Sequence, residues 1–160
     1  MKRLAALALV LVSVTAAGCG SSSSGGSAPS SGGASADTAA GKTAATTQIT
    51  AVWTTFFNAA TPDATALSDL EDGSTLQQAF AIGRKAAKKQ QIVESAKVKK
   101  VDFTSPTAAT VTYDLLSSGS PVLSDATGDA LLVNGKWVVA KHTFCQLVQL
   151  SAGGKTLPGC

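Results

Sequence analysis

The chain has 160 residues, a formal net charge of +3 and 14% charged residues. Lys2 and Arg3 account for two of the basic residues, and without them eleven basic and ten acidic residues remain. This near-neutral balance lacks the basic excess that is typical of nucleic-acid-binding domains, so we expect no nucleic-acid partner.

The N-terminal residues have the pattern of an export signal. A charged start precedes an apolar run over residues 4–14, and small residues then lead to Cys19. This order of charged, apolar and small residues is typical of a secretory signal peptide. The apolar run is shorter than the ~20 residues that a membrane-spanning helix needs. The sequence therefore predicts a signal peptide over residues 1–18.

Cys19 directly follows the small residues, a pattern that resembles the lipobox of bacterial lipoproteins. In that motif a diacylglycerol is attached to the thiol and the chain is cut just before the cysteine. Ala16 stands where the lipobox usually has leucine. The alternative is an ordinary secreted protein that is cut near Ala17 or Gly18. An exposed free thiol is a liability outside the cytosol, so we expect lipidation of Cys19 and anchoring to the outer face of the cell membrane.

Residues 19–46 contain the lipidated cysteine and then almost only Ser, Gly, Ala, Thr and Pro. Such a segment lacks the large apolar side chains that offset the entropy of ordering, so the sequence predicts a disordered linker. The remaining residues, 47–160, are long enough for one domain with a modest core.

The first part of this domain has the periodicity of helices. An apolar stripe at helical spacing predicts the first helix, which Thr46 or Thr47 can cap. The stripe consists of Ile49, Val52, Trp53, Phe56, Phe57 and Ala60. Thr61 and Pro62 are suited to the start of a short second helix, which ends before Gly73. The inner edge of this helix is formed by Ala64, Leu67 and Leu70.

A capping-box pattern at Ser74 predicts a third helix that reaches about Gln91. Its inward side is formed by Leu76, Ala79, Phe80, Gly83 and Ala87. A basic cluster, Arg84, Lys85, Lys88 and Lys89, lies in its last turns. The simpler interpretation is a solvated face that complements the end of the helix dipole. The alternative is a patch that contacts anionic headgroups or wall polymers.

The second part of the domain has the pattern of strands. Residues 97–103, 108–116 and 122–133 form the first three, and Gly128 marks a bulge or bend in the third. Asn134-Gly135 is the strongest hairpin signal in the chain. It leads into a last strand from Lys136 to about Leu150. Helices followed by antiparallel strands predict an α+β domain.

Cys145 and Cys160 remain once Cys19 is set aside, and in an exported protein we expect them to form a disulfide. The single histidine, His142, has no cysteine or histidine partner at the spacing of a zinc site. No Gly-x-Ser-x-Gly nucleophile motif is present. We expect no metal and no cofactor, and we place His142 as a partly buried residue of the last strand.

Over about residues 46–160 the chain resembles the actinobacterial low-molecular-weight antigen family. The residues that carry the resemblance are 52–57 (VWTTFF), 70–73 (LEDG), 135–139 (GKWVV) and 143–145 (TFC), and Cys160 matches the closing cysteine of the family. The family has secreted and lipid-anchored members, and it implies no catalytic residues. The resemblance implies a cystatin-like, or nuclear-transport-factor-two-like, cone. In that fold three N-terminal helices pack on a curved four-stranded antiparallel sheet.

Two functions fit these observations. The first is a non-enzymatic surface lipoprotein whose cone binds a small apolar ligand or an envelope protein. Apolar residues would line this candidate pocket: Trp53, Phe57, Phe80, Val111 and Tyr113. The second is an isomerase- or hydrolase-like enzyme of the same fold that uses Tyr113 with Asp102 or His142. A polar pair that converges on an open cavity would favour the enzyme, since fold analogy alone is no evidence of activity.

Overall fold

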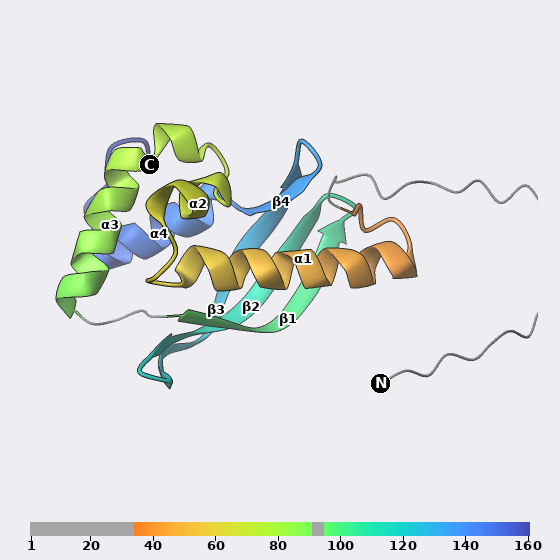
Figure 1. Ribbon diagram of the computed structural model, residues 1–160, viewed down its shortest axis with the longest axis horizontal. Coiled ribbons are helices and arrows are strands. Elements are labelled where there is room, and N and C mark those ends of the chain that lie inside the picture. Colours follow the sequence, from red (N-terminus) through yellow and green to blue (C-terminus); the bar gives the residue numbers. More distant parts are fainter. Residues whose placement is uncertain (1–33, 91–94) are drawn as a thin grey trace, which may run out of the picture. The chain divides into compact units, whose positions relative to one another are not determined.

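The computed structural model describes residues 34–90 and 95–160. The predicted signal peptide and Cys19 lie outside the described residues. Figure 1 shows the helices and strands in chain order: α1 (Ala39–Phe57), α2 (Asp63–Ser68), the short 3₁₀ helix η1 (Gly73–Thr75), α3 (Gln77–Gln90), β1 (Ser95–Ser105), β2 (Ala108–Ser117), β3 (Ser120–Val133), β4 (Lys136–Val139) and α4 (Lys141–Ser151). The predicted α+β class is confirmed. The prediction that all helices precede the sheet is wrong, because α4 follows it.

The four strands form one antiparallel sheet in the order β1-β2-β3-β4. The predicted hairpin at Asn134-Gly135 is confirmed, and both residues have positive φ, 50° and 76°. Ser118 and Gly119 at the preceding hairpin also have positive φ angles, 49° and 77°. Two consecutive positive φ angles give a turn whose twist matches that of the flanking strands, so these short turns fix the register of the sheet.

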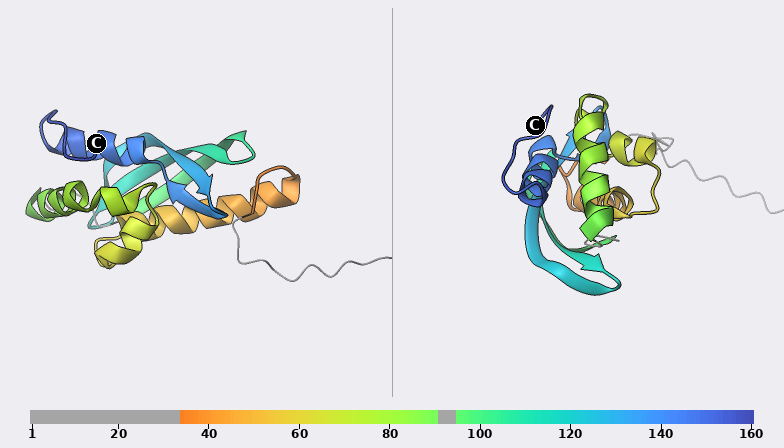
Figure 2. Two further views of the ribbon diagram at one scale, coloured as in Figure 1. Left: turned by 90° about the horizontal axis from the view of Figure 1, so that it is seen from above. Right: turned by 90° about the vertical axis from the view of Figure 1, so that its left-hand side faces the viewer.

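The sheet curves around α1, as the right-hand view of Figure 2 shows. The register of β1 shifts between Val98 and Lys100, and that of β3 shifts opposite Asp114. Such bulges bend a strand and increase its twist. Lys99 donates a hydrogen bond to the Asp125 carboxylate at 2.6 Å and lies 3.6 Å from the carboxylate of Asp114. These three charged groups come from β1, β2 and β3 and meet at the bend.

Gly128 does not form the bulge or bend that the sequence predicts. It pairs with Val111 in regular register. A Cβ atom at residue 128 would overlap the Cγ2 atom of Thr143. The Thr143 hydroxyl also accepts a hydrogen bond from the Asp129 N–H at 2.8 Å. Glycine is therefore needed at this position because α4 packs directly on β3.

Helix α1 begins at Ala39, well before the predicted boundary at residue 47. Its N-cap is Thr38, whose hydroxyl accepts a hydrogen bond from the Gly41 N–H at 3.0 Å, so neither Thr46 nor Thr47 caps it. Ala45 is fully buried. The Trp137 indole also donates to the carbonyl of Ala34 at 2.9 Å. Alanine is the strongest helix former, so an alanine-rich segment can extend a helix once a packed partner is present. Residues 34–46 are therefore part of the folded unit.

Helix α2 has Pro62 at its N-cap and no side-chain cap, so the predicted role of Thr61 is wrong. Ala66 and Leu70 are buried, whereas Ala64 is exposed. After α2 the chain runs parallel to β4. The Val139 N–H donates to the carbonyl of Asp69 at 2.8 Å, and the Glu71 N–H donates to the carbonyl of Val139 at 2.9 Å. Residues 69–71 therefore cover the outer edge of β4.

Helix α3 begins at Gln77, after η1, and not at the predicted Ser74. Leu76, Ala79 and Phe80 are buried, as their spacing predicts. Gly83 faces α4 so closely that an added Cβ atom would lie 2.7 Å from the Val148 Cγ1 atom. Because Gly83 has no side chain, α3 and α4 can pack at this short distance.

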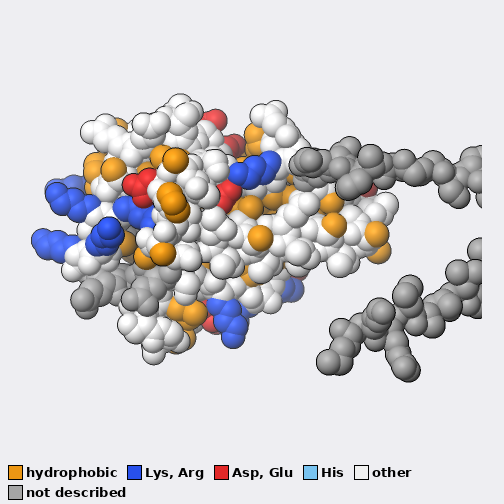
Figure 3. Space-filling view, in the orientation of Figure 1, with side chains coloured by type: hydrophobic (Ala, Val, Ile, Leu, Met, Phe, Trp, Pro, Cys, Tyr) orange, Lys and Arg blue, Asp and Glu red, His pale blue; other side chains and the backbone are white. Residues whose placement is uncertain are grey.

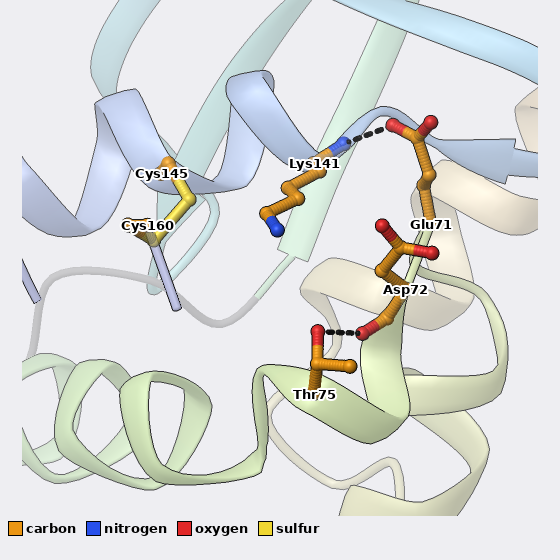
Figure 4. Close-up of a disulfide and its surroundings, with 6 residues drawn as sticks. All are labelled: Glu71, Asp72, Thr75, Lys141, Cys145 and Cys160. Carbon is orange, nitrogen blue, oxygen red and sulfur yellow. Dashed lines mark hydrogen bonds between the residues drawn. A yellow bond between two sulfur atoms is a disulfide. The ribbon is translucent and has the colours of Figure 1, made fainter. Parts of the chain in front are cut away.

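The prediction that the last strand runs to Leu150 is wrong. The chain leaves β4 at Val139 and enters α4. Phe144 and Val148 are buried at helical spacing, and His142 is exposed, not part of the sheet. The N-cap residue of this helix, Ala140, makes no side-chain capping hydrogen bond. The Glu71 carboxylate instead accepts a hydrogen bond from the Lys141 N–H at 2.9 Å, as Figure 4 shows.

The predicted disulfide between Cys145 and Cys160 is present and is drawn in Figure 4. It joins α4 to the end of the chain. Leu157 in this tail packs against the core, and Gly159 lies beside Thr75 and Leu76. The bridge therefore holds the C-terminal tail between α4 and the start of α3.

The double variant Cys145→Ser, Cys160→Ser should be less stable than the wild type. The bridge closes a loop with a sequence separation of 15 residues, and such loops are worth about 3 kcal/mol in the chain-entropy model. Urea unfolding of the oxidised proteins measures the difference. As a control, reduced wild-type protein should unfold like the variant. Equal midpoints for oxidised wild type and variant would contradict the stabilising role of the bridge.

Candidate functional site

Three phenylalanine rings join three helices at one end of the sheet. Phe56 of α1, Phe80 of α3 and Phe144 of α4 have ring centroids 5.9–6.1 Å apart. At most 5% of each residue is exposed. Aromatic pairs at these separations stabilise a fold beyond the area that they bury. This phenylalanine cluster fixes the relative positions of α1, α3 and α4.

A cleft of about 790 Å³ lies against the phenylalanine cluster. Its walls come from the end of α1, from α3 and α4, and from the hairpin between β2 and β3. Representative lining residues are Gly83 and Ala87 of α3, Leu147 and Val148 of α4, and Leu115 and Leu123 of the two strands. This volume lies within the range of about 300–1,000 Å³ that is usual for small-molecule sites. The cleft is therefore the candidate site.

Two of the five predicted pocket residues, Phe57 and Phe80, line the cleft. The other three, Trp53, Val111 and Tyr113, are fully buried between α1 and the sheet and do not line it. Phe57 connects the two regions, because its ring also stacks on Tyr113 at 5.4 Å. The interior of the predicted cone is thus filled by side chains, and the open space lies at its end.

The sequence prediction misses the wall that α4 contributes. Leu147 and Val148 are assigned there to a strand, although Phe144 and Val148 already have the four-residue spacing of a helix face. The hairpin wall is missed as well, because Leu115 and Leu123 approach the helices only when the sheet curves. The helical spacing of Phe144 and Val148 is the one signal that could have identified part of this wall.

Tyr113 is enclosed by aromatic rings. The Trp53 ring contacts it edge-on at 6.0 Å. Within the described part of the chain, neither the Tyr113 hydroxyl nor the Trp53 indole N–H has a hydrogen-bond partner. Burial disfavours the charged phenolate and raises the pKa of Tyr113 to about 12.

The structure does not bring Tyr113 together with Asp102 or His142 by a hydrogen bond. Asp102 is exposed and pairs with Lys100 at 2.9 Å. His142 Nε2 lies 2.8 Å from Asp129 Oδ2. Thr110 also donates to the Asp129 carboxylate, at 2.9 Å. The polar pair that would favour an enzyme is therefore not formed around Tyr113.

The charged side chains that line the cleft are both cationic. They are Arg84 and Lys88, and no Asp or Glu is among the described lining residues.

Residues 34–90 and 95–160 contain no group of three or more His, Cys, Asp or Glu side chains that could hold a metal ion. In the same ranges no helix is both long enough and apolar enough to cross a membrane.

The ionisation of Tyr113 should be detectable directly, because it is the only tyrosine in the chain. In the folded protein the phenolate absorbance should appear with a midpoint near pH 12, and in urea near the ordinary value of about 10. The neutral form is the stable one inside the fold. Stability should therefore be unaffected by this group below pH 10 and fall as the pH rises from 10 through 12.

The control for this titration is Tyr113→Phe, which should remove both the absorbance change and its share of the stability loss. A folded-state midpoint near 10 would contradict the burial of the hydroxyl.

Comparison with protein families gives a match over most of the chain. The model described as low molecular weight antigen MTB12, C-terminal domain, matches residues 42–155. Comparison with curated proteins and with solved structures gave no match. The family match covers more than half of the 160-residue chain. The chain therefore belongs to the family of the low molecular weight antigen MTB12 C-terminal domain.

Proposed function

We propose that this protein is a non-catalytic surface lipoprotein that binds a small apolar ligand in the cleft. Membership of an antigen family indicates a secreted or surface protein. The finer location rests on the sequence pattern at Cys19, whose thiol would carry a diacylglycerol. The helices on the curved sheet are compatible with the cystatin-like cone that the sequence resemblance implies, and we propose that fold as well.

The observation that carries the ligand proposal is the apolar cleft. Four phenylalanines line it: Phe56, Phe57, Phe80 and Phe144. Two large apolar residues that line it are also well exposed, with 47% of Val122 and 71% of Leu150 accessible. Covering exposed apolar surface stabilises a complex by about 25 cal/mol per Å² before the costs of association. An apolar ligand would therefore gain most by lying against these side chains.

The composition of the cleft favours binding over catalysis. Its described lining residues include no Asp, Glu, His, Cys or Tyr side chain. Serines and Lys88 line the cleft, but a serine nucleophile needs an adjacent general base, and the usual bases His, Asp and Glu are not among these residues. Tyr113, the centre of the enzyme alternative, lies behind Phe57 and has no polar partner within the described part of the chain. The proposal accordingly includes no catalytic residue and no cofactor.

The lipid anchor is tested in the native host. The exported wild-type protein should begin at Cys19 and have a mass increased by acyl chains. The Cys19→Ser variant should appear in the culture medium, because it lacks the thiol to which the diacylglycerol would be attached. Ser21→Ala is the matched control and should stay with the membrane fraction. An exported protein without acyl mass, or a Cys19→Ser variant that stays with the membrane, would contradict the anchor.

Ligand binding is tested with the neutral apolar dye Nile red. Wild-type protein should enhance its fluorescence saturably. Val122→Asp and Leu150→Asp each place a charge on the cleft surface and should weaken binding about tenfold or more, because burying an unpaired carboxylate is costly. Val133→Asp is the matched control, since Val133 is 38% exposed but does not line the cleft.

All three variants should keep the wild-type unfolding midpoint within a small margin, because the replaced side chains are exposed. Absence of saturable binding by the wild type, or equal losses in Val133→Asp and Val122→Asp, would contradict an apolar site in the cleft.

A further inference from the structure

We infer that the ligand of the cleft is an anionic amphiphile, with an apolar chain in the cleft and a negatively charged head held at its mouth by Lys88. This inference rests on the proposed function and adds the charge and polarity of the ligand. Its starting point is the sign of the lining charges, since Arg84 and Lys88 line the cleft and no described acidic residue does.

Arg84 has a structural role that uses most of its donors. Its guanidinium donates to the carbonyls of Asn58, Ala59 and Thr61 at 3.1–3.2 Å. It lies 3.7 Å from the Asp63 carboxylate and 5.1 Å from the centre of the Phe80 ring. Arg84 therefore ties the end of α1 to α3, and its charge is partly balanced by Asp63. It is not the group that selects a ligand.

Lys88 is the cation that stays available at the cleft. It is exposed in the last turn of α3, and no hydrogen bond or ion pair joins it to another described residue. Lys85 and Lys89 are exposed on the same helix. Figure 3 shows Lys and Arg side chains gathered over α3. An anion at this mouth would form a charge-assisted contact with Lys88 without breaking an existing one.

The surrounding helices strengthen this preference. The sequences of α3 and α4, which form two walls of the cleft, contain no acidic residue. The carbonyl end of α3 contributes about half a negative charge. The lysines of this helix, Lys85, Lys88 and Lys89, more than offset it. The described side chains of this helix therefore carry a net positive charge at this side of the cleft.

The orientation of the ligand follows from the cost of burying charge. A carboxylate placed against the phenylalanine cluster would lose its hydration without gaining a partner. At the mouth it keeps water and gains Lys88. The chain end of the amphiphile would then lie against Phe80 and Phe144, and the head would stay near the end of α3.

The test compares two probes with the same apolar chain, palmitate and hexadecanol, as competitors of Nile red on the full mature protein. Palmitate should bind more tightly than hexadecanol, and only its affinity should fall as salt is raised. Lys88→Gln should weaken palmitate binding about three- to tenfold, in line with the loss of one charge contact, and leave hexadecanol unchanged. Lys88→Glu should weaken palmitate further.

Lys89→Gln is the matched control. It removes an equal charge from the neighbouring residue, which does not line the cleft, and should change palmitate binding less than twofold. Equal affinities for palmitate and hexadecanol, both unaffected by Lys88→Gln, would overturn the anionic head but leave an apolar site in place. Failure of Nile red and both competitors to bind would overturn the proposed function itself.

An experiment with vesicles distinguishes binding of a single amphiphile from docking on a membrane surface. Sedimentation with phosphatidylglycerol vesicles, with phosphatidylcholine vesicles as reference, measures surface docking of the chain lacking its lipid. If Lys88→Gln and Lys89→Gln weakened this sedimentation equally while palmitate failed to displace Nile red, the basic cluster would serve a lipid surface, and the inference would be wrong.

Discussion

The arrangement of the helices depends on the contact between Phe56, Phe80 and Phe144. Each ring comes from a different helix, and each is almost fully buried. Truncating a buried phenylalanine typically costs about 3–5 kcal/mol, and here the loss would loosen three helices together. The same rings form part of the cleft, so packing and the candidate site share one set of side chains. Two further features position the walls of the cleft. Gly83 lets α3 pack closely on Val148, and the disulfide fixes the C-terminal tail beside α4.

Much of the fold could be predicted from local patterns, and the failures have a common cause. The apolar stripe of α1 and the Asn134-Gly135 hairpin are local signals, and both are present in the structure. The start of helix α4 was not predictable in this way, because its first N–H group is capped by Glu71, a residue 70 positions away in the chain. The start of α1 was obscured because alanine and threonine carry little apolar surface, and their order depends on packing partners such as Trp137.

The candidate site could be predicted only in part. Aromatic content pointed to Phe57 and Phe80, which line the cleft, but equally to Trp53 and Tyr113, which fill the core. Sequence gives the residue type and the face of a helix, whereas the difference between core and cleft depends on where the sheet bends. Bulges at Lys99 and Asp125 set that bend. Exposed charged residues are common along strands, so the sequence alone does not show that a bulge lies at these two positions. The role of Lys88 likewise emerges only when α3 is placed beside the open space.

The short parallel connection at residues 69–71 has a consequence for self-association. It pairs with the outer edge of β4 at Val139, so this end of β4 is not free to pair with a strand of another molecule. An uncovered edge can recruit a strand from another molecule. β1 is the edge strand at the other side of the sheet, and Lys97, Lys99 and Lys100 along it disfavour such pairing. Main-chain pairing at β4 and lysine side chains along β1 thus protect the two edge strands in different ways.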